Sequence, residues 1–290
     1  MAQMTWEESV QWLRDQPEQQ GLVQACYFDD PLFEAAQRFW QSAEWQATAV
    51  LLPPPPGRAL DLGAGRGIGS YAMAYDGWQV TALEPDPSPL VGAGAIHGLA
   101  QQSGLPIEVV SEYSERLPFD DNSFDVVNCR QALHHAHNLE QTCREIYRVL
   151  KPKGVMIATR EHVISQPEDL QAFLDSHPLH RFYGGEHAYL LTEYLSALEQ
   201  AGLQMRQVLA PLDSPINYFP MTLDQWHEYC TKPVAKLIGP GLAHGLFNPR
   251  HPLGRWLLPQ LAHFRNAVDQ TPGRLYTFVA VKPSMARSAG

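Results

Sequence analysis

The sequence predicts an α/β fold with a doubly wound, mostly parallel sheet of seven strands and helices on both faces. Two observations support this prediction. Short apolar runs alternate with helical segments between residues 58 and 160, and a glycine-rich turn follows the first run. Alternating strands and helices favour right-handed crossovers and hence parallel pairing. Ligands of such sheets bind beyond the carboxyl ends of the strands, so we expect the functional site at that edge.

The individual elements follow from changes in the hydrophobic period along the chain. Apolar runs predict five strands in the first part of the sheet, at 59–63, 78–85, 107–111, 124–129 and 155–160. Helical spacing predicts helices at 68–75, 89–102, 138–150 and 190–201. Two later runs, 204–209 and 275–282, complete the seven strands.

Three units are expected along the chain. Residues 1–52 predict an N-terminal helical cap, which the proline run after it ends. Residues 53–163 predict a Rossmann-like core that binds the cofactor, and residues 164–290 supply the remainder of the sheet. Within this last unit the segment 211–273 is too long for a simple connection, and we expect it to be an insertion that covers the substrate.

Composition narrows the class of partner. The net charge of −10 argues against nucleic acid, because such binding depends on clustered Lys and Arg, and favours a small-molecule substrate. The four cysteines are widely separated and show no zinc spacing, which is typical of reduced thiols in the cytoplasm. No apolar run is long enough to span a bilayer, so no membrane partner is expected. Composition does not specify an oligomeric state.

The run DLGAGRG, residues 61–67, lies where a strand passes into a helix, a place suited to a nucleotide-like ligand. A nicotinamide dinucleotide site would need G-x-G-x-x-G, but the third glycine position falls on Ile68 or Ser70. Asp61 would repel a pyrophosphate, whereas it suits the ammonium and sulfonium charges of an amino-acid-bearing cofactor. Glu84 ends the second strand, where a carboxylate can accept both ribose hydroxyls.

Five segments, DLGAGRG, ALEPD, SERLPFDDNSFDVV, QALHH and REIYRVLKPKG, occur in an order and spacing that resemble the class I methyltransferases grouped with ubiquinone and menaquinone methylating enzymes. The resemblance covers about residues 58–160 and implies S-adenosyl-L-methionine as cofactor. It places Asp61, Gly63 and Gly65 at the methionine end, Glu84 at the ribose, and Pro85, Ser114 and Glu115 at the adenine. The family often has Asp where this chain has Tyr113, so the backbone would replace that contact.

Residues after the fourth and fifth strands are candidates for contacts with the methyl acceptor. Arg130 can pair with the cofactor carboxylate, or else bond a helix end. His135, or its neighbour His134, can act as general base, or else pack a helix start. Glu161, His162 and Tyr183 are the remaining catalytic candidates, with an ordinary polar loop as the alternative. His135 and His137 lack a third ligand at metal spacing, so no metal site is predicted.

The predicted function is methyl transfer from S-adenosylmethionine to oxygen or nitrogen of a small polar molecule, because the candidate segments are rich in polar, titratable side chains. A carbon acceptor stays open. The first alternative is a noncatalytic S-adenosylmethionine-binding scaffold. The second is an NAD-dependent oxidoreductase, which the glycine register disfavours.

Overall fold

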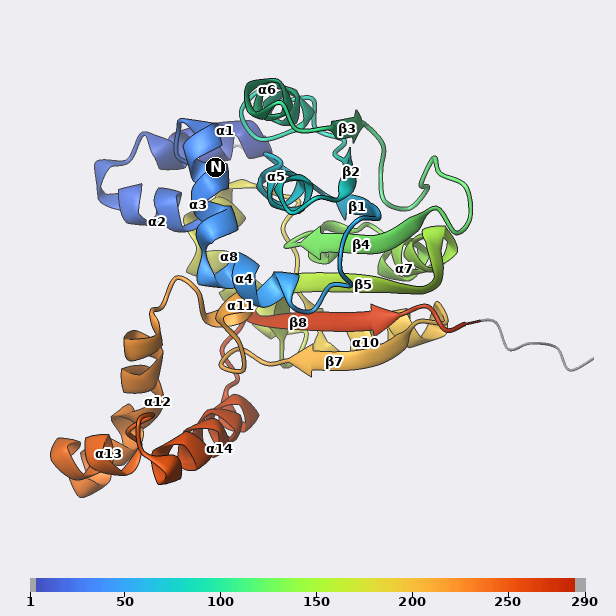
Figure 1. Ribbon diagram of the computed structural model, residues 1–290. Coiled ribbons are helices and arrows are strands. Elements are labelled where there is room, and N and C mark those ends of the chain that lie inside the picture. The colour runs from blue at the N-terminus through green and yellow to red at the C-terminus, as the bar shows by residue number, and fades with distance from the viewer. Residues whose placement is uncertain (1–3, 285–290) are drawn as a thin grey trace, which may run out of the picture.

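The strands form a single sheet, and in Figure 1 they follow one another from β3 at the top to β7 at the bottom. The computed structural model describes residues 4–284, so the ends of the first and last predicted units lie outside it. Strand order is β3-β2-β1-β4-β5-β8-β7, and β6 pairs with β5. All pairings are parallel except the two made by β8. The bounds are β1 Arg58–Leu62, β2 Gln79–Leu83, β3 Ile107–Val110, β4 Phe124–Arg130, β5 Leu150–Ile164, β6 Tyr189–Leu190, β7 Gln204–Leu209 and β8 Arg274–Val281.

The predicted α/β class and the mostly parallel sheet are therefore confirmed, with one strand more than expected. The extra strand, β6, has only two residues, too few to leave a hydrophobic period in the sequence. Strand β5 continues beyond the predicted end at residue 160, through a register shift between Ala158 and Glu161 where it pairs with β8. This extension brings polar residues to the carboxyl edge of the sheet.

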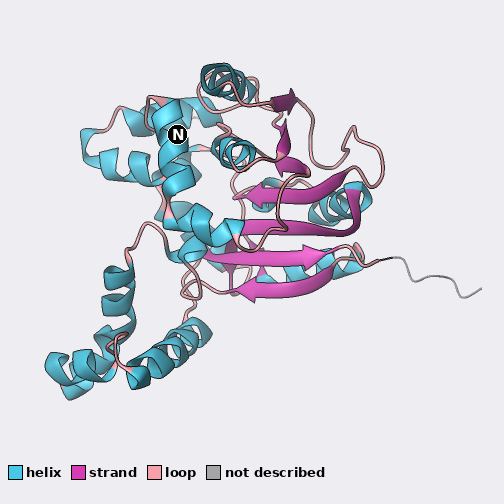
Figure 2. Ribbon diagram, in the orientation of Figure 1, coloured by secondary structure: helices cyan, strands magenta, loops and turns pink. Residues whose placement is uncertain are grey.

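Helices cover both faces of the sheet (Figure 2). On one face α7 and α10 pack against the central strands, and on the other α5 and α6 do so. The sequence dictates this placement: in α7 the buried residues Leu139, Cys143, Ile146 and Val149 recur at helical spacing. The bounds are α5 Ile68–Tyr75, α6 Ala93–Ser103, α7 Leu139–Val149 and α10 Leu191–Gln200.

The N-terminal helices lie at the end of the sheet to which β4 points (Figure 1). Val10 and Leu13 are fully buried and pack with Val91 and Leu179, which joins the first helices to the loop after β2 and to α9. Helix α3 packs along α5. The bounds are α1 Trp6–Arg14, η1 Pro17–Gln19, α2 Gln20–Ala25, α3 Leu32–Gln41, α4 Ala43–Ala49, α8 Asp169–Ser176 and α9 Pro178–Phe182.

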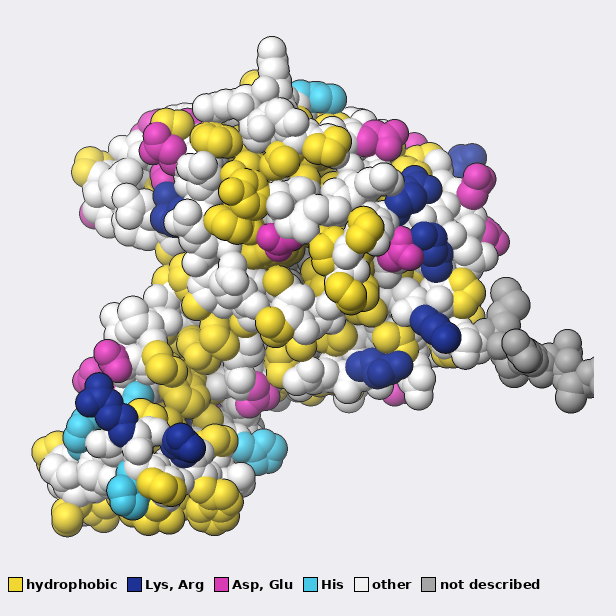
Figure 3. All heavy atoms as spheres, in the orientation of Figure 1, with side chains coloured by type: hydrophobic (Ala, Val, Ile, Leu, Met, Phe, Trp, Pro, Cys, Tyr) yellow, Lys and Arg dark blue, Asp and Glu magenta, His cyan; other side chains and the backbone are white. Residues whose placement is uncertain are grey.

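The segment 211–273 differs from the predicted cover over the substrate. Only α11, Pro215–Tyr218, packs against α4, β5 and β8. Helices α12 Leu223–Ile238, α13 Pro240–Leu246 and α14 Pro252–Val268 contact mainly one another and project away from the sheet (Figure 1). Figure 3 shows hydrophobic side chains on this unit, and the exposed residues include Leu237 and Trp256. The prediction that the whole insertion covers the sheet edge is wrong for α12–α14. Within residues 4–284, no helix is long and apolar enough to cross a membrane.

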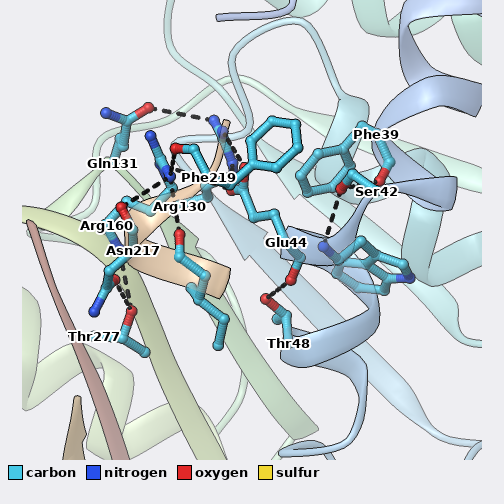
Figure 4. A network of polar contacts seen from close by, with 12 residues as sticks. Phe39, Ser42, Glu44, Thr48, Arg130, Gln131, Arg160, Asn217, Phe219 and Thr277 are labelled. Atoms are coloured by element: carbon cyan, nitrogen blue, oxygen red, sulfur yellow. Dashed lines mark hydrogen bonds and ion pairs between the residues drawn. The ribbon is translucent and has the colours of Figure 1, made fainter. Parts of the chain in front are cut away.

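A buried charge network connects the cap to the sheet (Figure 4). Glu44 of α4 is 1% exposed, and its carboxylate accepts two bonds from Arg130, at 2.7 and 3.2 Å, at the end of β4. Arg160 of β5 lies 3.8 Å from the same carboxylate. Buried charges require such partners, since desolvation costs each of them several kcal/mol.

The network continues from Arg160 into α11 and β8 (Figure 4). The Arg160 guanidinium donates to the carbonyl oxygens of Ile216 and Phe219, each at 2.9 Å. Asn217 accepts from the Thr277 hydroxyl at 2.7 Å and donates to the carbonyl oxygen of Leu209. Elements far apart in the sequence, from α4 to β8, are thereby fixed to the carboxyl end of β5.

We expect Glu44→Gln to lower the free energy of unfolding by about 3–5 kcal/mol, because an uncharged amide leaves two buried guanidinium groups without their counter-charge. Urea denaturation followed by circular dichroism measures the change. Glu34→Gln, an exposed position on the neighbouring α3, is the matched control and should have little effect. Equal stability of the two variants would contradict the anchoring role of Glu44.

Candidate functional site

The glycine-rich loop between β1 and α5 lies beside the end of β2. Backbone N–H groups of Gly63 and Ala64 donate to the carbonyl oxygen of Leu83, which fixes the loop against that strand. Gly65 has φ +54°, and a Cβ added there would meet only the Val91 carbonyl oxygen, at 3.9 Å. The loop therefore presents an open, side-chain-free surface at Gly65, where a ligand can approach the backbone closely.

Glu84 lies directly beneath this surface. Its carboxylate accepts from the N–H of Gly65 at 2.7 Å and from the N–H of Asp86 at 3.0 Å, and only 8% of the residue is exposed. Burial raises the pKa of Glu84 to about 7, although both backbone donors favour the carboxylate. A carboxylate held at a strand end beside a glycine loop is suited to accept ligand hydroxyls.

Asp61 is more deeply buried than the predicted role at the methionine end implies. It is 2% exposed, and its two oxygens accept from Ser70 at 2.6 Å and from Asn128 at 2.7 Å. Burial raises the pKa of Asp61 against the effect of these donors. Ser70 occupies the helix position where a dinucleotide fingerprint has its third glycine, and its side chain fills the contact between α5 and β1. This packing supports the sequence-based argument against a pyrophosphate site.

The other predicted cofactor residues follow the neighbouring strands. Pro85 is half-buried after Glu84. Ser114 lies beyond β3 and its hydroxyl is 3.1 Å from that of Thr142. Glu115 accepts from the N–H groups of His137 and Asn138, just before α7, which leaves less of its carboxylate for an adenine.

Arg130 is placed differently from the prediction. Its guanidinium is bound by Glu44 and lies over the rings of Tyr27 and Phe39, at 5.7 and 5.2 Å from their centroids. The structure thus gives this side chain an internal carboxylate as partner instead of leaving it free for the cofactor. The pairing holds the cap against β4.

A second cluster of polar groups lies beyond β4 and β5. His134 is 2% exposed and stands between two carboxylates: its Nδ1 is 2.7 Å from Glu161, and its Nε2 is 3.2 Å from Glu186. Burial disfavours a charged imidazole, but the two carboxylates outweigh it and raise the pKa of His134 to about 9. The same interactions keep the pKa of Glu186 below its usual range despite burial.

Glu161 was predicted to contact the methyl acceptor, but its carboxylate is bound by the protein itself. It is fully buried and accepts from the backbone N–H groups of Ala132, Leu133 and His134, at 3.0–3.1 Å. These residues form the turn η2, Leu133–His135, and Ala132 lies where a Cβ on Gly63 would collide, at 2.8 Å. Glu161 is therefore a positioning residue that fixes the turn beside the glycine loop.

His135 and Tyr183 lie together on the more open side of the turn. About a third of the His135 side chain, 35%, is exposed, and its Nδ1 is 3.3 Å from the carbonyl oxygen of Gly185. Burial and the charge on His134 lower the pKa of His135 to about 4. The Tyr183 ring packs against Trp6 of α1, with centroids 5.1 Å apart. Burial and the carboxylates of Glu186, Asp86 and Glu84 raise the pKa of Tyr183, so its hydroxyl keeps its proton.

His162 lies behind this surface. Its Nδ1 is 2.9 Å from the carbonyl oxygen of Gly273, and its ring lies 4.8 Å from that of His134. Burial lowers the pKa of His162 well below its usual value. His137, by contrast, is 83% exposed and lies near Glu115, so the His135–His137 pair does not converge on one point.

The glycine loop, the buried carboxylate after β2 and the polar cluster after β4 and β5 all lie at the carboxyl edge of the sheet, where ligands of Rossmann-like folds bind. Comparison with known proteins specifies the family. Residues 60–158 match the methyltransferase domain family. A ubiquinone biosynthesis O-methyltransferase of Pseudomonas putida is 37% identical over 98 residues, which cover 33% of this chain and 41% of that protein. This segment therefore matches the methyltransferase domain family, and the predicted resemblance to methyltransferases is confirmed over it.

Solved structures share the fold over most of the chain. Phosphoethanolamine N-methyltransferase 2 of Haemonchus contortus, solved in complex with S-adenosyl-L-methionine, has a TM-score of 0.54 at 18% identity, covering 91% of this chain and 60% of that one. The [4+2]-cyclase SpnF has a TM-score of 0.52 at 20% identity, covering 87% and 81%. The chain spans about two fifths of the length of the curated relatives it matches.

Proposed function

We propose that the chain transfers a methyl group from S-adenosylmethionine to an oxygen or nitrogen of a small polar molecule. The observation that supports this best is the buried Glu84 carboxylate bonded to Gly65 within a domain of the methyltransferase family. The Glu84 carboxylate can accept hydrogen bonds from ribose hydroxyls, and the backbone at Gly65 is open beside it. A nucleoside with a chain at its 5′ carbon requires both features.

The residues present fit S-adenosylmethionine. Glu84 would accept from the ribose hydroxyls, and Gly65 leaves room for the cofactor to lie against the loop. Pro85 and Ser114 would flank the adenine, while Asp61 would hold the loop from below through Ser70 and Asn128. When bound, the cofactor supplies a methyl group activated by a positive sulfonium. The protein then has to align a nucleophile and exclude water.

His135 and Tyr183 are the proposed acceptor contacts. His135 is the last residue of the turn that Glu161 fixes, the Tyr183 ring lies 6.2 Å from the His135 ring, and Trp6 of the N-terminal cap packs near both. Besides the Trp6 ring, the Glu186 carboxylate lies 4.0 Å from His135 Nε2, and this polar group favours an oxygen or nitrogen acceptor over a carbon acceptor. The role of His135 as a base stays a prediction, and alignment of the acceptor is the role that its position supports.

Two alternatives differ in what they predict. A noncatalytic S-adenosylmethionine-binding protein would keep the glycine loop and Glu84 but transfer nothing, and a [4+2]-cyclase among the structural neighbours illustrates that this fold does not by itself define the reaction. An NAD-dependent oxidoreductase would need a pyrophosphate at the loop, where Ser70 and Asp61 oppose it. Titration with S-adenosylhomocysteine and with NADH separates the second alternative from the proposal.

Label should pass from S-[methyl-³H]adenosylmethionine to a small molecule of a cell extract when the protein is added. His135→Ala should lower this incorporation on the order of 10²-fold, because a displaced acceptor no longer lies in line with the methyl group. His97→Ala, an exposed position on α6, is the matched control. No transfer by the wild-type protein would favour the noncatalytic alternative, and equal rates for both variants would remove His135 from the acceptor site.

Gly65→Val should abolish binding of S-adenosylhomocysteine while the protein remains folded. The added side chain would fill the open space over the loop, where few protein atoms oppose it. Gly104→Val is a matched control, since Gly104 also has positive φ and a Cβ there meets nothing within 4 Å. Isothermal titration calorimetry on both variants measures the effect. Similar affinities would place the cofactor elsewhere.

Binding of S-adenosylhomocysteine should weaken about tenfold between pH 8 and pH 6. Glu84 has a raised pKa of about 7, so its carboxylate is mostly ionised at pH 8 and mostly protonated at pH 6. Only the ionised form accepts both ribose hydroxyls. Glu84→Gln should bind weakly and with little dependence on pH over this range. A pH dependence that persists in Glu84→Gln would show that another group titrates.

A further inference from the structure

We infer that His134, His162 and Glu186 form a binding site for one divalent transition-metal ion, with Zn²⁺ as the expected occupant. One ring nitrogen of each histidine and one carboxylate oxygen of Glu186 lie within 4.8 Å of one another. The three residues come from η2, from β5 and from the loop before β6, so no sequence spacing joins them. The predicted absence of a metal site rested on the cysteine spacing and on the His135–His137 pair alone.

The hydrogen bonds on the far side of each ring support this inference. His134 Nδ1 bonds Glu161 at 2.7 Å, and His162 Nδ1 bonds the carbonyl oxygen of Gly273 at 2.9 Å. A proton on each Nδ1, assigned here from these two acceptors, leaves Nε2 of His162 with a free lone pair, and Nε2 of His134 gains one when the ion displaces the proton shared with Glu186. Metal-binding histidines are oriented in this way by a carboxylate or a backbone carbonyl on the other nitrogen.

The chemistry of the donors and the separation of one donor pair suit zinc. His134 Nε2 and Glu186 Oε1 are 3.2 Å apart, which is close to the separation of two ligands that each lie about 2.0–2.2 Å from one tetrahedral ion. His180 Nε2 lies 3.9 Å from the same oxygen and is placed to serve as a fourth ligand. Imidazole and carboxylate donors together favour Zn²⁺ over Mg²⁺ or Ca²⁺, which prefer oxygen alone.

The main competing arrangement is an ion triad without metal, in which a protonated His134 bridges Glu161 and Glu186. This triad satisfies His134 equally well but assigns no function to His162, whose ring is held edge-on to His134. It also predicts that the protein is indifferent to added metal. The two arrangements therefore differ in a directly measurable property.

The site does not depend on the proposed methyl transfer, and its test reads metal content instead of activity. If both proposals hold, an acceptor oxygen near His135 would take the fourth position on the ion in place of His180. The acceptor O–H would then lose its proton to water, and its oxygen would form the new C–O bond as the S–CH₃ bond breaks and its electron pair stays on sulfur. The favoured acceptors in that case carry a hydroxyl or phenol group.

The experiment uses the full chain, stripped with a chelator and titrated with ZnSO₄ or CoCl₂. We expect one Zn²⁺ per chain by elemental analysis, a higher melting temperature with Zn²⁺, and visible absorption bands with Co²⁺. His162→Ala and Glu186→Gln should each weaken binding on the order of 10²-fold or more. His187→Ala is the control, since it adjoins Glu186 but its ring packs against Tyr189. Circular dichroism checks that each variant is folded.

Two outcomes would overturn the inference. A wild-type protein that retains no Zn²⁺ and whose melting temperature is unchanged by Zn²⁺ or chelator would establish the metal-free ion triad. Unchanged binding in His162→Ala and Glu186→Gln would place the ion elsewhere. If a variant loses the metal but still transfers methyl groups, only the role of the ion in the reaction is overturned. If the protein binds the metal but transfers no methyl group, only the proposed function is contradicted.

Discussion

The position of the whole acceptor side depends on the burial of two guanidinium groups at the carboxyl ends of adjacent strands. Arg130 and Arg160 are largely removed from water there, so they require acceptors from other elements, and they obtain them from Glu44 and from the carbonyl oxygens of Ile216 and Phe219. Removal of a single partner would leave a charge in a medium of low polarity. The N-terminal cap is consequently not an independent layer but is held by electrostatic contacts to the same edge that carries the site.

A second buried carboxylate performs the analogous task on a smaller scale. The Glu161 carboxylate accepts hydrogen bonds from three successive backbone N–H groups and from Nδ1 of His134. One side chain therefore determines both the path of the turn η2 and the orientation of the His134 ring. The turn in turn abuts Gly63 of the cofactor loop through Ala132. The glycine loop and the polar cluster around His134 are thus connected through a few buried hydrogen bonds. Hydrogen bonds are stronger in such surroundings of low polarity.

The sequence allowed accurate prediction where the signal is local. Helix 68–75 and strand 204–209 have the predicted bounds, because glycine turns and hydrophobic periods mark both ends. The position of Glu84 directly after β2 was predictable for the same reason, while its role with a cofactor stays a prediction. Glu44 was missed because its partner lies 86 residues away and nothing in an amphipathic helix distinguishes a buried acid from an exposed one. The pairing of Glu186 with His134 was not predicted because these residues are also far apart in the sequence. The projection of α12–α14 was not predicted because hydrophobic periodicity does not show which other elements a helix contacts.

The order of strands has a consequence for synthesis of the chain on the ribosome. Strand β8 lies between β5 and β7, so β5 has no partner on that side until residues 274–281 have emerged. The nascent chain therefore carries the apolar edge of a parallel sheet, including Ile157 and Ala158, while more than a hundred further residues are translated. Unpaired edges of this kind associate with other chains. The antiparallel insertion of β8 therefore makes completion of this sheet a late event in synthesis of the chain.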